Sequence, residues 1–383
     1  LRRRSHLSID SLNRKPVLTI NKSYKFRAMP NAEQRVLFAK TVGCARFVYN
    51  RMLADKIAYY KETGKMLHNT PAQYKDEFPF LREVDSMALC NAQMQVQTAY
   101  KNFFRDKSIG FPKFRSKKSS RKAYTTNKIK GNIDVAGNCL KLPKMGLVRV
   151  KFHRQIPESH HIKSVTFSQN SSGKYYVSIL TEYEADIPER TLDADKALGL
   201  DYSSPHFYVD SQGVEADMPH FYRQAEQRLA MEQRKLSKMV KGSSNYQKQK
   251  RRIALVHEKV RNQRKDWQHK ESRKLSDKWD IVCVENVNYK GMSSSLRLGK
   301  ATQDNGFGQF RTFLSYKLAE QGKKLITIDK WFPSSKLCRH CGYVNDVLTL
   351  SDRVWVCPSC GETILRDKNA AINIRNAGVA QIA

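Results

Sequence analysis

The chain has 383 residues, a length that suggests about two or three domains, and its 40% hydrophobic content is enough for packed cores. It carries 69 Lys and Arg against 36 Asp and Glu, and a net charge of +33 would repel itself unless a polyanion neutralised it. No apolar run approaches the roughly 18 residues of a membrane span, so we expect no membrane partner and favour nucleic acid over a merely solvated basic surface.

The first half of the chain predicts a strand followed by helices. Residues 1–16 are charged and lack the apolar core of a secretory signal, so we expect a disordered basic tail on a cytoplasmic protein. Residues 17–29 alternate like a strand. Asn31 is a suitable N-cap with Gln34 at the capping-box offset, and apolar residues with helical spacing follow. A second helical stretch over 83–106 completes a helical insert.

The next segment is basic and aromatic. Residues 101–130 hold eleven Lys and Arg against one acidic residue, and Gly110 and Pro112 interrupt any continuous helix. Such a loop can pair with phosphates and stack on bases, although a flexible charged linker would have the same composition. The candidate nucleic-acid contacts of this loop are Lys113, Arg115, Lys117, Lys118, Arg121 and Lys122.

A period of two then indicates strands over 139–183, with a hairpin turn at 170–173. Together with the strand at 17–29 they predict a small β-barrel that the helical insert interrupts. From about residue 191 the pattern is α/β. Residues 222–275 predict a basic helical hairpin broken at 241–245, and its charges also fit an ordinary solvated helix face. The second arm has an apolar seam every seven residues. The seam consists of Tyr246, Ile253, Val260 and Trp267.

Two C-x-x-C pairs stand near the C-terminus, separated by fifteen residues. Thiolates with this spacing form two knuckles that close a tetrahedral zinc site, which leaves no open position for a substrate and is therefore structural. The predicted ligands are Cys338, Cys341, Cys357 and Cys360. The other four cysteines are scattered in apolar contexts and are expected to be buried free thiols of a reducing compartment. They are Cys44, Cys90, Cys139 and Cys283.

Three acidic residues stand at strand ends or a helix start. Asp201 and Glu285 follow apolar strand-like runs, and Asp367 precedes the helical run "NAAINI". Carboxylates gathered at one sheet edge are ligands for Mg²⁺ or Mn²⁺, and two such ions can drive phosphodiester cleavage. Each acid alone has an ordinary alternative: a turn residue, a salt-bridge partner or a helix cap. Spacing alone does not bring the three together.

The run from "FPSSKLCRHCG" to "WVCPSCGETILRDKNAAINI" resembles the C-terminal signature of the transposon-encoded TnpB proteins, relatives of type V CRISPR effectors. The resemblance extends in order through "YKFRAMPNAEQ", "CARFVYNRML", "AYKNFFRDKSIGFPKFRSKK", "LKLPKMGLVRVK", "LGLDY" and "IVCVENVN". It implies a multidomain α/β protein with a wedge β-barrel at 17–30 and 120–190 and a helical recognition lobe at 31–119. An RNase H-like RuvC nuclease domain at 191–335 and 364–383 would carry an inserted zinc ribbon at 336–363.

The resemblance also implies an activity: an RNA-guided DNA endonuclease. It would bind a transposon-derived guide RNA and cut double-stranded target DNA beside a short target-adjacent motif. Carried over residue by residue, the catalytic triad falls on Asp201, Glu285 and Asp367, which would hold two Mg²⁺ or Mn²⁺ ions, and one structural Zn²⁺ falls on the four paired cysteines. We expect a monomer with its RNA in a bacterial or archaeal cytoplasm.

Three alternatives to this activity stay open. They are a nuclease-silent RNA-guided DNA-binding repressor, a TnpB-like effector adopted by a CRISPR locus, and a transposase that moves the element. The sequence departs from the family at Ser203, where many members have Gly. The helix that resembles the family's motif-reading element has Ser86, Met87, Cys90 and Met94, so few long polar side chains are present. Asn91 and Gln93 are the remaining candidate base-edge readers.

Overall fold

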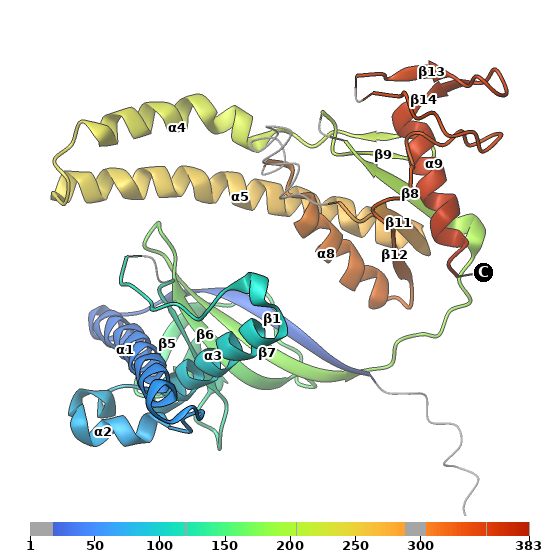
Figure 1. Cartoon of the computed structure of the whole chain (residues 1–383). Helices are drawn as coiled ribbons and strands as arrows, with labels where there is room; N and C mark the ends of the chain where they lie inside the picture. Colours follow the sequence, from blue (N-terminus) through green and yellow to red (C-terminus); the bar gives the residue numbers. More distant parts are fainter. Residues whose placement is uncertain (1–17, 119–120, 204, 288–303, 350, 383) are drawn as a thin grey trace, which may run out of the picture. The chain divides into compact units, whose positions relative to one another are not determined.

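The computed structural model describes residues 18–118, 121–203, 205–287, 304–349 and 351–382 (Figure 1). The tail predicted at 1–16 lies outside the described residues. The chain divides into two compact units, Leu1–Asp186 and Ile187–Ala383, and each is described by itself. Among the described residues, no helix combines the length and apolar character that a membrane crossing requires.

The first unit is built on a seven-stranded antiparallel sheet with the order β2-β6-β7-β1-β5-β4-β3. Its strands are β1 (Leu18–Met29), β2 (Ala123–Asn127), β3 (Asp134–Ala136), β4 (Cys139–Leu142), β5 (Gly146–Lys151), β6 (His161–Gln169) and β7 (Tyr175–Ala185). The predicted alternation is confirmed in β5, where Val148 and Val150 are buried between exposed neighbours. The predicted hairpin turn is confirmed as well, because Gly173 N–H donates to Asn170 O between β6 and β7.

The structure corrects the closed barrel to an open sheet. Among the described residues, β2 and β3 are the two edges, and each pairs with a single neighbour. Alternation predicts which face of a strand is buried, but it does not determine whether the edges meet. Here helices cover the apolar face instead, since Phe38 and Ala88 pack in the same core as Phe26 and Phe167 of the sheet.

The helices of the first unit follow the predicted insert. The longer ones are α1 (Ala32–Thr63) and α3 (Ser86–Arg105), with the short elements η2 (Pro71–Gln73), α2 (Tyr74–Glu77), η3 (Pro79–Arg82) and η4 (Lys107–Ile109). The capping box of α1 is confirmed: Gln34 N–H donates to Asn31 Oδ1 at 2.8 Å, and Asn31 N–H donates to Gln34 Oε1 at 3.0 Å. Between α1 and α3 lies a second core that includes Val48, Met52 and Leu89.

The second unit contains a mixed five-stranded sheet with the order β10-β9-β8-β11-β12. Its strands are β8 (Ala197–Tyr202), β9 (Tyr208–Asp210), β10 (Glu215–Ala216), β11 (Ile281–Glu285) and β12 (Lys324–Ile328), with η5 (Ala194–Lys196) before the first. Strands β8, β11 and β12 are parallel, whereas β9 and β10 are antiparallel. Residues 197–200 and 281–284 are buried on both faces, as expected for strands covered on both sides.

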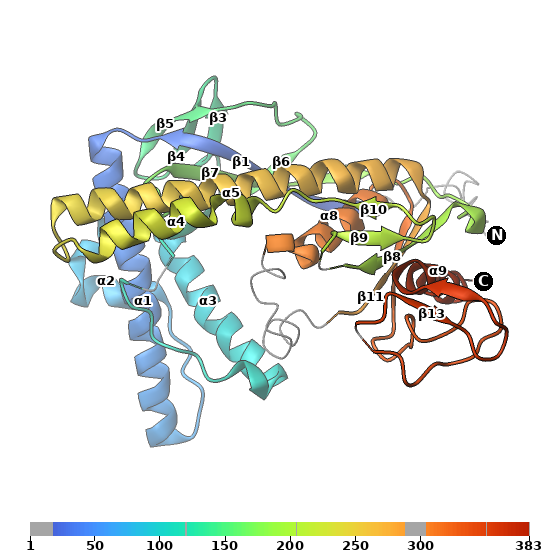
Figure 2. The same ribbon diagram turned by 90° about the horizontal axis from the view of Figure 1, so that it is seen from above.

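Helices cover both faces of this sheet. The covering helices are α5 (Ser244–Lys278), α8 (Phe307–Ala319) and α9 (Arg366–Val379), while α4 (Phe221–Ser237) packs along α5. Leu275 of α5 and Phe310 of α8 pack with Leu198 on one face, and Ile374 of α9 packs with Cys283 on the other. The predicted helical hairpin is confirmed, because α4 and α5 run side by side (Figures 1 and 2). Its seam is partly buried, and Val260 is its fully buried member.

Candidate functional site

Two of the three predicted acids end neighbouring parallel strands. Asp201 lies near the end of β8 and Glu285 ends β11, and these strands pair in register up to Leu200 and Val284. Asp367 is in the first turn of α9, which crosses β8 at very short range. A Cβ at Gly199 would overlap the carbonyl oxygen of Ala371, so only glycine lets α9 approach this closely. The packing therefore brings the start of α9 toward the strand ends.

The charges of the three acids interact. Burial raises the pKa of Asp201 well above its usual value, and the neighbouring charges of Glu285 and Asp367 raise it further. Arg366 and Arg353 act in the opposite direction. Burial also raises the pKa of Glu285, while the Ser334 hydroxyl, which donates a hydrogen bond to its carboxylate, lowers it. Asp201 therefore lies within electrostatic range of both other carboxylates, and such an anionic site favours a cation.

Two arginines form ion pairs with Asp367. Arg366 donates to Asp367 Oδ1 from Nε at 2.9 Å and from Nη2 at 2.8 Å, and Arg353 donates from Nη1 to Oδ2 at 3.1 Å. The N-cap of α9 is Leu365, without a side-chain cap, so Asp367 is an ion-pair partner in the first turn and not the helix cap. A cavity of about 370 Å³ lies beside it, lined in part by His206 and Lys368.

The four paired cysteines form a compact cluster. Their sulfur atoms all lie within 4.8 Å of one another, with Cys338 to Cys360 at 3.7 Å and Cys341 to Cys357 at 3.5 Å. A tetrahedral zinc ion with bonds of about 2.3 Å separates its sulfurs by about 3.8 Å, so the cluster fits this ion. Each knuckle turns at a glycine with a φ of 75°, at Gly342 and Gly361. Strands β13 (Val354–Val356) and β14 (Thr363–Leu365) form the attached hairpin.

The two ligand sets differ in compactness. Within the described parts of the chain, the four cysteines are the one group of three or more potential metal ligands whose donor atoms lie this close together. The carboxylates interact through their charges at longer range. Of the other cysteines, Cys44 and Cys283 are buried as predicted, whereas Cys90 and Cys139 are only partly buried.

Two asparagines of α9 connect the acids with the cysteine cluster, and the sequence analysis missed them. Asn369 and Asn373 are 0% and 3% exposed. Asn373 Nδ2 donates to the carbonyl oxygens of Ser334 at 2.8 Å and Leu337 at 2.7 Å, and Asn369 Nδ2 also donates to Leu337 O at 2.7 Å. Ser334 in turn donates to Glu285. The available signal was the spacing of four between two amides, which places both on one helix face.

The predicted nucleic-acid contacts have different surroundings. Lys113, Lys117, Lys118, Arg121 and Lys122 are exposed. Arg115 instead lies over the ring of Tyr49 at 3.7 Å and donates from Nη1 to Gln95 Oε1 at 2.6 Å. An open cavity of about 590 Å³ adjoins this loop. It is lined by Gln95, Lys113, Phe114, Arg115, Arg121, Ala123, Tyr124, Thr125 and Thr166.

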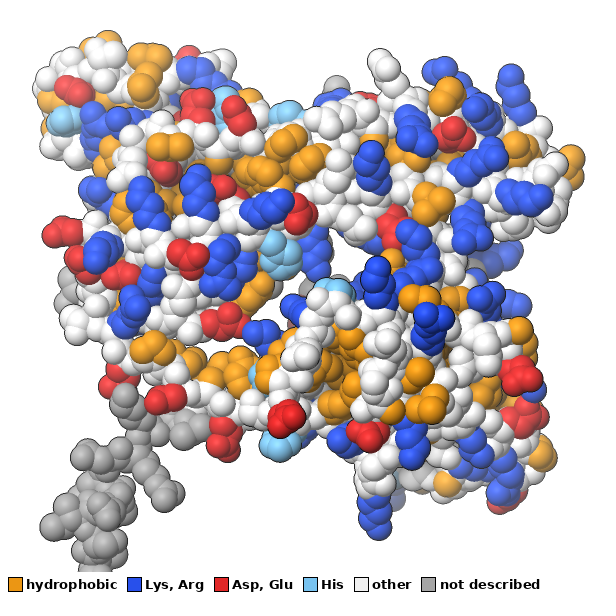
Figure 3. Space-filling view, turned by 180° about the vertical axis from the view of Figure 1, so that it is seen from behind, with side chains coloured by type: hydrophobic (Ala, Val, Ile, Leu, Met, Phe, Trp, Pro, Cys, Tyr) orange, Lys and Arg blue, Asp and Glu red, His pale blue; other side chains and the backbone are white. Residues whose placement is uncertain are grey.

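Asn91 and Gln93 use their amide nitrogens within the chain. Asn91 Nδ2 donates to Met87 O at 2.9 Å, and Gln93 Nε2 donates to Asn69 O at 3.0 Å. Lys and Arg side chains are spread over the face of the molecule in Figure 3, with fewer Asp and Glu among them. A role of Asn91 and Gln93 in base reading stays a prediction. The nucleic-acid contacts of the basic loop at 101–130 also stay predictions.

Family models match three parts of the chain. The "Cas12f1-like, TNB domain" model matches residues 307–374, which include the cysteine cluster and Asp367. The "Probable transposase" model matches residues 178–296, and the "Helix-turn-helix domain" model matches residues 20–65. The last region folds here as strand β1 followed by the continuous helix α1.

A solved structure shares the fold. The cryo-EM structure of a Cas12f1–sgRNA–target DNA complex matches with a TM-score of 0.60 and 13% identity, over 94% of this chain and 99% of that one. The two proteins therefore share a fold.

Curated relatives include two that match nearly the whole chain. A "Putative RNA-guided DNA endonuclease" of Streptomyces pristinaespiralis is 34% identical over 95% of this chain and 91% of its own length. InsQ of Escherichia coli strain K12, which carries the same description, is 29% identical over 94% of this chain and 93% of its own length. Cas12f1 of Sulfoacidibacillus thermotolerans, a CRISPR-associated endodeoxyribonuclease, is 24% identical over 55% of this chain and 51% of its own length. The chain belongs to the TnpB family, which is related to these type V effectors.

Proposed function

We propose that this chain is an RNA-guided DNA endonuclease and that Asp201, Glu285 and Asp367 are its catalytic residues. The names of its full-length relatives support the class of enzyme. The observation that carries the site is the raised pKa of Asp201, caused by burial and then by the charges of Glu285 and Asp367. Perturbed carboxylates gathered at a strand edge are typical of functional sites in α/β folds.

The donor set fits a hard divalent cation. Carboxylate oxygens are preferred ligands of Mg²⁺ and Mn²⁺, and the mutual repulsion that raises the pKa of Asp201 is relieved by positive charge between the acids. We propose that these three residues hold two Mg²⁺ or Mn²⁺ ions. When bound, such ions supply a nucleophilic water and neutralise charge that develops on the scissile phosphate.

The surrounding residues prepare this site. Asp201 is fixed by strand β8, and Ser334 orients Glu285 through the hydrogen bond that it donates. Arg366 has a side chain only 11% exposed and anchors Asp367 through two hydrogen bonds, whereas that of Arg353 is 55% exposed. Arg353 is therefore the more easily displaced partner, free to turn toward a DNA phosphate when Asp367 takes a cation. Cys338, Cys341, Cys357 and Cys360 would hold a zinc ion that fixes the segment carrying Arg353.

The finer parts of the assignment belong to the same proposal. The guide would be a transposon-derived RNA, the substrate double-stranded DNA beside a short target-adjacent motif, and the active form a monomer with its RNA in the cytoplasm. The chain would comprise a wedge domain at 17–30 and 120–190 and a recognition lobe at 31–119. A RuvC domain at 191–335 and 364–383 would carry the zinc ribbon at 336–363.

The test is cleavage of plasmid DNA by the purified RNA complex in Mg²⁺, with the guide sequence read from the copurifying RNA. Asp367→Ala is expected to lower the cleavage rate more than about 100-fold, because loss of groups that merely support metal ligands already costs 10–100-fold. Asp280→Asn is the matched control. Asp280 is a buried acid just before β11, at the opposite end from Glu285, and pairs with Lys323 at 3.5 Å.

Three outcomes would contradict parts of this proposal. If Asp367→Ala cut as fast as wild type, the triad assignment would be wrong. Guide-dependent DNA binding without any cut strand in Mg²⁺ or Mn²⁺ would identify a repressor. Strand transfer by the protein alone would identify a transposase, the activity named by one matching family model.

A further inference from the structure

A cluster of aromatic rings lies exposed where α3 ends. We call it the aromatic patch and define it as Tyr100, Phe103, Phe104, Ile109 and Phe111. Phe104 is 66% exposed, Ile109 52% and Phe111 46%, while Tyr100 is buried beneath them. The rings of Tyr100 and Phe104 are stacked with centroids 6.3 Å apart, and Phe111 meets the ring of Phe103 at 5.4 Å. This is a contiguous surface and not a set of scattered apolar residues.

The backbone is shaped to build this patch. Asp106 ends α3 and caps η4, since its N–H donates to Asn102 O at 2.9 Å and its carboxylate accepts from Ser108 N–H at 2.9 Å. Gly110 then turns the chain with a φ of 80°, a left-handed conformation that side chains disfavour. The turn brings Phe111 back onto Tyr100, with centroids 5.6 Å apart.

Within the described residues of the first unit, Phe104, Ile109 and Phe111 stay exposed to solvent. Apolar surface in water costs about 25 cal/mol per Å², and contiguous exposed patches usually mark binding sites. Tyr100 alone extends the α1–α3 core, whereas Phe104 and Phe111 project beyond it. The patch therefore fits an apolar partner with flat faces.

The charges around the patch specify that partner further. The exposed cations Lys101, Arg105, Lys107 and Lys113 come from the same short segment as the rings. The one acid there, Asp106, is occupied by its hydrogen bonds to Ser108. An apolar surface whose own segment carries four exposed cations complements a ligand with flat apolar faces and a polyanionic backbone, which is a nucleic-acid strand with unpaired bases.

We propose that the aromatic patch stacks on unpaired nucleobases of a single nucleic-acid strand, with the strand's phosphates on the surrounding cations. The proposal rests on the proposed function, because an RNA-guided nuclease handles two kinds of unpaired strand. One is the guide RNA outside its base-paired parts, and the other is DNA separated from its complement. Both offer the same chemistry to Phe104 and Phe111.

The experiment measures fluorescence anisotropy of a labelled twenty-nucleotide oligo-uridine RNA on the RNA-free chain, and of an oligo-thymidine DNA of equal length on the RNA-loaded chain. Base stacking on an aromatic ring contributes about 1–3 kcal/mol, so Phe104→Ser is expected to weaken binding about 5–150-fold. The slope of log affinity against log salt should not change, because no cation is removed. Lys101→Gln with Lys107→Gln should instead flatten that slope.

Two further variants separate stacking from other effects. Tyr60→Ser is the matched control, since Tyr60 is a 56% exposed aromatic residue near the end of α1, outside the patch. It should leave both affinities unchanged. Phe104→Trp keeps a stacking face and should bind at least as well as wild type, which also shows that the position tolerates substitution without unfolding.

Weaker binding of RNA alone would assign the patch to the guide, and weaker binding of DNA alone would assign it to the separated strand. Unchanged affinity of Phe104→Ser for both probes would overturn the proposal, as would a loss accompanied by a flatter salt slope. Plasmid cleavage by the RNA-loaded Phe104→Ser complex is measured in parallel. Absence of guided cleavage in the wild type would contradict the proposed function while leaving the strand-binding result intact.

Discussion

The cysteine cluster and the carboxylate site lie in the same unit but are assembled in opposite ways. The four cysteines come from one short segment, 338–360, and their sulfur atoms already lie within 4.8 Å of one another. The carboxylates come from two strands and a helix that are far apart in the sequence, and two arginines pair with one of them, Asp367. Local spacing thus determines the first site, while the packing of α9 on the sheet determines the second.

The substitution with the largest expected effect disrupts the cysteine cluster. Cys357→Ser should lower zinc content from about one ion per chain to near zero, because a closed four-ligand site depends on every thiolate. Structural zinc binding contributes about 10–16 kcal/mol in small domains, so residues 336–363 should lose their order. Elemental analysis measures the zinc, and hydrogen exchange of these residues measures the order.

The matched control is Cys139→Ser, which changes a partly buried cysteine of β4 in the other unit. Zinc content should not change. If Cys357→Ser kept one zinc ion per chain, the ribbon assignment would be wrong. The contrast between a cysteine site set by local spacing and a carboxylate site set by packing would then fail.

The same contrast explains what the sequence could predict. The capping box at Asn31 and the paired cysteines depend on neighbours within a few residues, so their patterns predicted them correctly. Closure of the β1–β7 sheet depends on whether distant edges meet, and the barrel prediction was wrong. The spacing of four between Asn369 and Asn373 places both on one helix face, but it does not show that they are buried and hydrogen-bonded to the loop around Ser334, because the sequence does not distinguish a buried asparagine from an exposed one.

A middle-sized effect tests the connection between the two sites. Asn373→Ala removes the amide that donates to Ser334 O and Leu337 O. Leu337 O keeps Asn369 as a donor, whereas the buried Ser334 carbonyl loses this one, at a cost of about 1–3 kcal/mol of unfolding free energy. Ser334 would then hold Glu285 less firmly, so cleavage should fall about 10–100-fold while zinc is retained. Denaturant unfolding and plasmid cleavage measure the two effects.

Asn376→Ala is the control for that change, since Asn376 lies exposed on the same helix. Both stability and cleavage should stay near wild type. A loss of zinc in Asn373→Ala would show that the cysteine cluster itself depends on α9, and the contrast between a local and a long-range site would fail.

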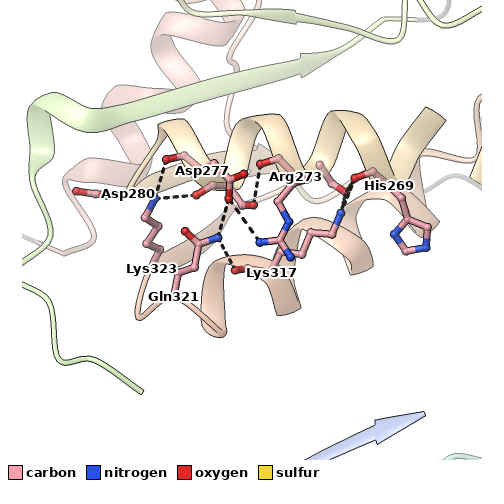
Figure 4. Close-up of polar contacts among 9 residues, drawn as sticks. His269, Arg273, Asp277, Asp280, Lys317, Gln321 and Lys323 are labelled. Atoms are coloured by element: carbon pink, nitrogen blue, oxygen red, sulfur yellow. Dashed lines mark hydrogen bonds and ion pairs between the residues drawn. The ribbon is translucent and has the colours of Figure 1, made fainter. Parts of the chain in front are cut away.

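The smallest expected effect concerns the packing that supports β11. Lys317 of α8 is 4% exposed and donates to His269 O at 2.5 Å and Ser272 Oγ at 2.7 Å, both uncharged acceptors on α5 (Figure 4). Burial, and then the charge of Arg273, lower its pKa to about 8, against the opposing charges of Asp277 and Glu320. The charged amine therefore destabilises the folded state.

This shift gives stability a defined pH dependence. Below pH 8 the amine is charged in both states and its burial cost is fully present, whereas between pH 8 and about 10.5 only the unfolded state keeps the proton. The unfolding free energy contributed by Lys317 therefore rises across that window, by about 1 kcal/mol after allowance for screening. Lys317→Met should remove this rise when its denaturant unfolding is compared with that of wild type at each pH.

Lys323→Met separates this effect from the general loss of a buried lysine. Lys323 donates to Ser276 O at 2.7 Å and pairs with Asp280 at 3.5 Å, so its removal leaves a buried acid without that partner and should destabilise at pH 7. Zinc content should be unchanged in both variants, because the cysteine cluster needs only its own segment. If the unfolding free energy of Lys317→Met rose between pH 8 and about 10.5 as much as that of wild type, other groups would be responsible for the rise. Lys317 at the α5–α8 contact would then not be its source.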